Sequence, residues 1–133
     1  MAYFLSFNAG DEYLHVLFSG NFANGDVLAL WKDLVQYLEI HPCGQVLVEE
    51  QPGTVGNLDT LEIFETAKFL AVSRFVHRTR IALLYQEEVS AETLRQALFG
   101  ETVAVNRGLT FKVFHSRDAA LKWVRFWSSP VSE

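Results

Sequence analysis

The feature that most constrains the fold is a short, almost wholly apolar run in the middle of the chain. Residues 81–85 read Ile-Ala-Leu-Leu-Tyr, with polar, turn-forming segments on both sides. A half-buried strand alternates apolar and polar side chains, whereas a strand covered on both faces is apolar throughout. Such strands belong to parallel sheets with helices packed against them, so this run predicts an α/β fold.

The first half of the chain shows patterns that agree with this interpretation. Residues 3–8 and 13–19 are rich in β-forming side chains and are separated by a turn, which predicts a hairpin. From Val27 to Leu38, apolar residues recur at helical spacing. A further short strand is expected at residues 45–49.

The second half alternates helices with strands. A helix is expected to begin near Asp59, which with Glu62 three residues later has the form of a capping box, and residues 74–79 are its expected basic end. The next helix begins at Ser90, a residue type that caps helices. Alternation over residues 109–114 predicts another strand. Ser116 is a suitable cap for a last helix.

The order of these elements defines the fold class. It is β-β-α-β-α-β-α-β-α, which predicts a mixed, mostly parallel sheet of about five strands with about four helices. Residues 103–105 fit a strand or the tail of the third helix, and Gly108 favours the helix because glycine commonly ends one. We expect a single domain over residues 1–133, with residues 128–133 as a loose tail.

Composition argues against several classes of function. The net charge of −5 makes nucleic acid an unexpected partner. The apolar runs are far shorter than the roughly 20 residues of a membrane span, so no integral membrane segment is expected. Cys43 is the only cysteine and the chain does not begin like a signal peptide, which together predict a cytoplasmic protein.

Residues 106–123, NRGLTFKVFHSRDAALKW, combine a glycine, a strand that ends in Phe114, and a helix with Ala120 and Trp123. This segment resembles the closing part of STAS domains of the SpoIIAA-like branch. Residues 13–20 and the central apolar run fit the same pattern. The resemblance implies the STAS fold of anti-sigma-factor antagonists and a signalling role through contact with another protein.

The resemblance also implies a candidate switch. In STAS domains a phosphoacceptor serine or threonine, usually after an aspartate, begins the second helix, and Asp59 and Thr60 occupy that place here. A phosphate on Thr60 would meet free backbone N–H groups and the positive end of the helix dipole. The alternative is an ordinary first-turn threonine with Asp59 as the cap.

Four acidic residues form a second candidate site. Glu49 and Glu50 end the third strand, and Glu87 and Glu88 follow the fourth, so all four could gather at the carboxyl edge of the sheet. Paired carboxylates can bind Mg²⁺ or transfer protons. The alternative is that they are solvated strand ends. No phosphate-binding loop or histidine pair accompanies them, so we predict no catalytic residue, metal ligand or cofactor.

Aromatic residues form a third candidate site. Phe22, Phe64, Phe69 and Phe99 could line an apolar groove between the second and third helices, as in the lipid-binding CRAL-TRIO proteins that this branch resembles. Core packing and a homodimer surface are the alternatives.

These candidates together predict a non-enzymatic, STAS-like regulatory module. It would act through another protein, a second copy of itself or a small apolar ligand. The alternatives are a phosphorylation switch at Thr60, a lipid-like ligand carrier and a carboxylate-based enzyme.

Overall fold

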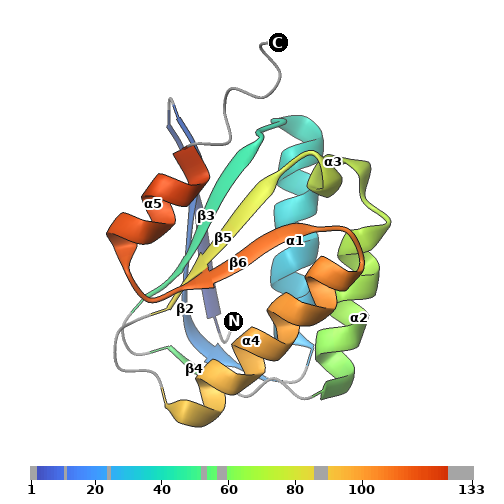
Figure 1. Ribbon diagram of the computed structural model, residues 1–133, viewed down its shortest axis with the longest axis vertical. Coiled ribbons are helices and arrows are strands. Elements are labelled where there is room, and N and C mark those ends of the chain that lie inside the picture. Colours follow the sequence, from blue (N-terminus) through green and yellow to red (C-terminus); the bar gives the residue numbers. More distant parts are fainter. Residues whose placement is uncertain are drawn as a thin grey trace.

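The chain forms one continuous sheet with helices on both faces (Figure 1). The computed structural model describes residues 3–10, 12–23, 25–51, 54–56, 60–85 and 90–125. The strands are β1 (Tyr3–Ala9), β2 (Leu14–Phe22), β3 (Gln45–Glu50), β4 (Val55–Gly56), β5 (Arg80–Leu84) and β6 (Thr110–Phe114). The helices are α1 (Asp26–Ile40), α2 (Thr60–Ala71), α3 (Arg74–His77), α4 (Ala91–Asn106) and α5 (Arg117–Arg125). The predicted α/β class and element order are confirmed, with β4 and α3 as additions.

The sheet is mixed and mostly parallel, as predicted. Its strand order is β1-β2-β3-β5-β6, in which β1 runs antiparallel to β2 and every later neighbour is parallel. The short strand β4 pairs with Asn21 and Phe22 of β2, beyond the last β2–β3 pair between Phe18 and Glu50. The loop after β3 therefore lengthens the sheet at the carboxyl end of β2.

The helices are divided unequally between the two faces. Three crossovers connect β2 to β3, β3 to β5 and β5 to β6, and each one moves to the next strand of the sheet in the same direction. Because such crossovers are right-handed, all of the connecting helices lie on one face. Figure 1 shows α1, α2 and α4 on that face and α5, in red, on the other. The larger core lies beneath α1, α2 and α4 and includes Leu14, Val16, Leu34, Leu38, Val48, Leu70, Ile81, Leu83, Phe111 and Val113.

Helix α5 covers the opposite face of the central strands. Its Ala120 and Val124 pack on a second cluster of buried side chains: Leu47, Ala82 and Leu84. On this face the Arg80 guanidinium carbon lies 4.0 Å from the centroid of the Trp123 ring. Strand β5 is thus covered on both faces, which explains why residues 81–84 are all apolar and all buried.

The predicted end of the second helix is wrong. Helix α2 ends at Ala71, and residues 74–77 form the separate turn α3 instead of a basic end to α2. Ser73 explains the break, because its Oγ accepts the Val76 N–H at 3.4 Å and its carbonyl oxygen accepts the His77 N–H at 3.2 Å. A serine at this position begins a new helical turn.

The ambiguous residues 103–105 are helical, as favoured. Helix α4 continues to Asn106 and closes with two reversed hydrogen bonds, from Gly108 N–H to the Val105 carbonyl and from Leu109 N–H to the Ala104 carbonyl. This is the Schellman arrangement, which needs a left-handed residue, and Gly108 has φ of 87°. The prediction that Gly108 closes the helix is therefore confirmed.

Gly100 offers a test of the helical layer, because it lies inside α4 with ordinary helical φ. A Cβ built there would lie 3.9 Å from Ile63 Cγ2, an ordinary contact. We expect Gly100→Ala to raise the free energy of unfolding by about 0.5–1 kcal/mol, since alanine loses less backbone entropy than glycine in a helix. Urea unfolding followed by circular dichroism measures the change.

Gly108→Ala is the matched control for this prediction. Gly108 has φ of 87°, a left-handed conformation in which a side chain is strained. Adding the same methyl group here should therefore destabilise the protein by about 1 kcal/mol. Equal effects at the two glycines would contradict the assignment of Gly100 to an unstrained helical position.

Within the described part of the chain, no helix combines the length and apolar character needed to cross a membrane.

Candidate functional site

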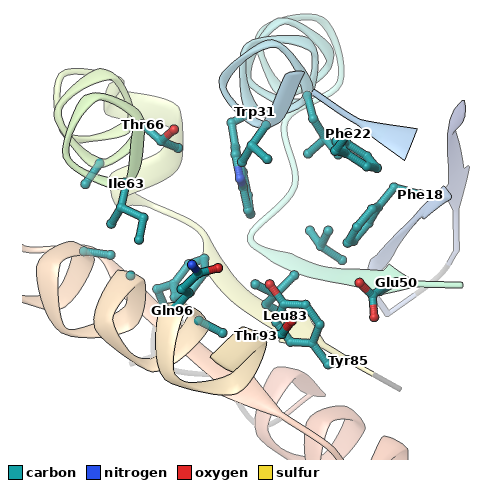
Figure 2. A pocket seen from close by; sticks show the side chains of 18 of the residues that line it. Phe18, Phe22, Trp31, Glu50, Ile63, Thr66, Leu83, Tyr85, Thr93 and Gln96 are labelled. Atoms are coloured by element: carbon teal, nitrogen blue, oxygen red, sulfur yellow. The ribbon is translucent and has the colours of Figure 1, made fainter. Parts of the chain in front are cut away.

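A pocket of about 140 Å³ lies between the helical layer and the carboxyl ends of β2, β3 and β5 (Figure 2). Helices α1, α2 and α4 form its outer walls. The carboxyl ends of strands are where open α/β sheets place ligands. Most of its lining is apolar: Phe18, Phe22, Val27, Leu30, Trp31, Val48, Ile63, Ala67, Leu70, Leu83, Ala97, Gly100, Ala104 and Phe111.

The space exists because small residues face large ones. Ala97 and Gly100 on α4, with Ala67 on α2, present little side chain to the pocket. Opposite them, Trp31 of α1 is only 6% exposed, and the centroid of its ring lies 5.9 Å from the centroid of the Phe111 ring. Rigid aromatic groups on one side and short side chains on the other leave room that the core does not fill.

Strand β2 contributes the end wall of the pocket. The sequence predicted a strand over residues 13–19, but the strand continues through Gly20, which has φ of 112°, and reaches Phe22. Phe22 then lies edge-on to Phe18 with ring centroids 5.5 Å apart. The strand extension therefore places two aromatic rings beside α1 at the pocket (Figure 2).

A few polar side chains interrupt the apolar lining. Glu50, Tyr85, Thr93 and Gln96 lie along the sheet and α4, and Thr66 comes from α2 (Figure 2). Burial raises the pKa of Tyr85, and the nearby charge of Glu50 raises this pKa further. The Tyr85 hydroxyl therefore keeps its proton at neutral and moderately alkaline pH. An apolar pocket with a few polar groups can fix the orientation of a small ligand.

The structure places two of the four acidic residues, Glu49 and Glu50, on opposite faces of the sheet. Successive side chains in a strand point to opposite faces, so Glu50 lines the pocket whereas Glu49 faces α5. Glu49 is buried between His15, whose Nε2 lies 2.8 Å from Glu49 Oε1, and Arg117. Glu87 and Glu88 lie outside the described residues.

The described ranges contain no group of three or more histidine, cysteine, aspartate or glutamate side chains placed to hold a metal ion.

The four phenylalanines of the expected groove do not all line one site. Only Phe22 lines the pocket. Phe64 and Phe99 contact each other edge to face at 5.7 Å and are 41% and 39% exposed. Phe69 packs beside the main core, with Lys32 Nζ 5.7 Å from its ring centroid.

The pocket lies on the inner side of the same helices that carry this exposed pair. Ile63 points inward and lines the pocket, and Phe64, one position later, points outward. Consecutive helical residues are about 100° apart around the axis, which accounts for the difference.

Thr60, the candidate phosphoacceptor, is the first residue of α2 and is exposed. Its neighbour Asp59 lies outside the described residues.

Glu62 joins the start of α1 to α2. It is 5% exposed, and its Oε2 accepts the N–H groups of Gly25 at 3.1 Å and Leu28 at 3.4 Å. The sequence suggested that Glu62 would cap its own helix with Asp59, but these bonds cap α1. Helix α1 has no side-chain cap of its own because Gly25 stands at its N-cap position.

Sequence reasoning did not identify Trp31, Thr66 or Tyr85 as site residues. Trp31 and Tyr85 look like ordinary core aromatics in sequence. Thr66 carries a signal that could have been used, because it is a polar residue on the buried face that Ile63, Ala67 and Leu70 define on α2. A hydroxyl at such a position needs a partner.

No known protein family matches the sequence, and no curated protein matches it either. The pocket and its lining are therefore the basis for a functional proposal.

Proposed function

We propose that the chain is a non-enzymatic, STAS-like regulatory module that holds a small apolar ligand, or the apolar part of one, in the pocket beneath α1, α2 and α4. The observation that carries the proposal is the pocket itself, about 140 Å³ with a mostly apolar lining at the carboxyl ends of the strands. A dry apolar cavity of roughly 150 Å³ in another protein binds benzene. One ring or a short alkyl chain therefore fits here.

The pocket volume favours a small ligand over a lipid. Pockets that hold drug-sized molecules usually have volumes of about 300–1,000 Å³, more than twice the 140 Å³ found here. A lipid would have to leave most of its chain outside, exposed to water. Small apolar ligands thus receive more support than the lipid-carrier alternative.

The STAS-like part of the proposal rests on the closing segment and the order of elements. Residues 106–123 form the end of α4, β6 and most of α5, with α5 alone on its face of the sheet. The resemblance implies that such a module acts on another protein or on a second copy. We propose that ligand occupancy biases that contact, which requires different ligand affinities in the bound and free states.

Filling the pocket tests the proposal. Ala97 is 5% exposed and lines the pocket, so Ala97→Leu should place extra carbon atoms where a ligand ring would lie. We expect toluene and indole to bind the parent protein and to bind this variant at least about tenfold more weakly, or about 1.4 kcal/mol. The thermal shift produced by each compound reports binding.

Ala91→Leu is the matched control, because Ala91 is an exposed residue of the same helix. It should leave the affinities unchanged. Circular dichroism of Ala97→Leu checks that overpacking, which typically costs about 1–3 kcal/mol, has not unfolded the chain. Equal affinities for folded Ala97→Leu and the parent, or no binding of any ring-sized apolar compound to the parent, would contradict the proposal.

A further inference from the structure

We infer that the Thr66 hydroxyl is a hydrogen-bonding anchor for the ligand, and that the ligand is a neutral, ring-sized molecule with one polar atom, such as a phenol. This inference rests on the proposed function. Thr66 is 8% exposed and lines the pocket. Among the described residues its Oγ1 is buried and has no hydrogen-bond partner.

An unpartnered hydroxyl is unusual at such a place. A threonine inside a helix commonly donates its hydroxyl hydrogen to a carbonyl oxygen three or four residues earlier. Thr66 makes no such bond. Buried polar groups are nearly always hydrogen-bonded, because leaving one without a partner costs free energy. A ligand atom in the pocket can supply the missing partner.

The surroundings of Thr66 define the rest of the ligand. Ile63 and Ala67, its neighbours on α2, are apolar and also line the pocket. Figure 2 shows Thr66 on the α2 side, with Trp31 of α1 facing the same space. A ring placed between these two helices would contact the indole, while a polar atom on that ring accepts or donates a hydrogen bond at Thr66.

The charge of the ligand follows from the same lining. Among the described lining residues, only Glu50 is charged, and it is acidic. An anionic ligand would be repelled by that carboxylate. An anion bound at Thr66 would also lose its hydration shell and gain only one hydrogen bond, from a neutral hydroxyl. Neutral molecules are therefore favoured over anions.

A pair of substitutions separates the hydroxyl from the shape of Thr66. Thr66→Val keeps the branched side chain and removes the hydroxyl, whereas Thr66→Ser keeps the hydroxyl. We expect Thr66→Val to bind phenol about fivefold to tenfold more weakly than the parent, which corresponds to one neutral hydrogen bond. Toluene should bind this variant at least as well as the parent, and Thr66→Ser should retain most of the affinity for phenol.

Thr66→Val also tests the anchor in the absence of ligand. Removing an unpartnered buried hydroxyl should leave the melting temperature of Thr66→Val equal to or above that of the parent.

Benzoate, the anionic relative of these probes, should bind the parent at least tenfold more weakly than phenol. Calorimetric titration at pH 7, where phenol is neutral, measures each affinity.

The outcomes distinguish the anchor from the pocket. If phenol binds the parent and Thr66→Val equally, the anchor is wrong while the proposed pocket function stands. A clear fall in the melting temperature of Thr66→Val would also overturn the anchor, because it would show that the hydroxyl has a partner within the fold. Failure of both phenol and toluene to bind the parent would remove the proposed function and the anchor with it.

Discussion

Glu62→Ala is expected to lower the free energy of unfolding by about 2–3 kcal/mol. Glu62 is 5% exposed, and its Oε2 accepts the N–H groups of Gly25 and Leu28. Hydrogen bonds to a charged group contribute about 1.5–3 kcal/mol, and the carboxylate also interacts with the positive end of the α1 dipole. No residue at the N-cap of α1 can replace it, since glycine has no side chain.

The measurement is urea unfolding of Glu62→Ala beside Glu65→Ala, an exposed glutamate one turn later on α2. The control should change stability by no more than about 0.5 kcal/mol. Glu62→Gln should fall between the two, because it keeps an acceptor oxygen and loses the charge. Equal stabilities of Glu62→Ala and Glu65→Ala would show that the cap contributes nothing.

The cap that Glu62 provides for α1 also affects the geometry of the pocket. Gly25 and Leu28 start the helix whose Val27 and Trp31 line the pocket. Thr66, on the other wall, lies one turn after Glu62 on α2. A carboxylate that fixes α1 against α2 therefore sets the distance between two pocket walls. If the proposed function holds, Glu62→Ala should also weaken ligand binding, although Glu62 itself is not among the lining residues.

Local sequence signals were sufficient for most of the fold. The apolar run at residues 81–85 predicted a strand covered on both faces, and β5 has that position. Ser90 and Ser116 were expected to cap helices, and each accepts a backbone N–H at the start of α4 or α5. These signals are local because a cap or a periodic pattern involves residues only a few positions apart.

Long-range features of the fold could not be read in the same way. Strand β4 is two residues long, too short for any periodicity, and its pairing with β2 spans more than thirty positions of sequence, as Asn21 with Val55. Glu62 was assigned to its own helix because capping boxes are local motifs. Its bonds to α1 depend on how two helices pack, which the sequence pattern does not specify.

The sequence predicted acidic residues at the carboxyl edge of the sheet, and the pocket lies at that edge. Of the candidate site residues singled out from the sequence, Phe22 and Glu50 line the pocket. Its lining comes from separate strands and helices, so membership depends on which way each side chain points. Glu49 and Glu50, adjacent in sequence, point to opposite faces, and so do Ile63 and Phe64. One position of sequence decides whether such a residue reaches the pocket.

Glu49 provides the second large effect, on the opposite face. Glu49→Ala is expected to lower the free energy of unfolding by about 2 kcal/mol, because Glu49 is 7% exposed and holds both His15 and Arg117. Removing one partner of a buried ion pair costs about 3–5 kcal/mol when the other stays buried. The Arg117 side chain is 51% exposed, so it can return to water, and the expected loss is smaller.

A double-mutant cycle with Arg117→Ala checks this assignment. Arg117→Ala alone should cost no more than about 1 kcal/mol, as is usual for a pair with an exposed member. The double variant should be little less stable than Glu49→Ala, since Arg117 has lost its partner there. Strictly additive losses would show that the two residues act independently. A coupled pair would mean that Glu49 anchors the first turn of α5 to β3, whereas Ala120 and Val124 hold the rest of the helix by apolar contact.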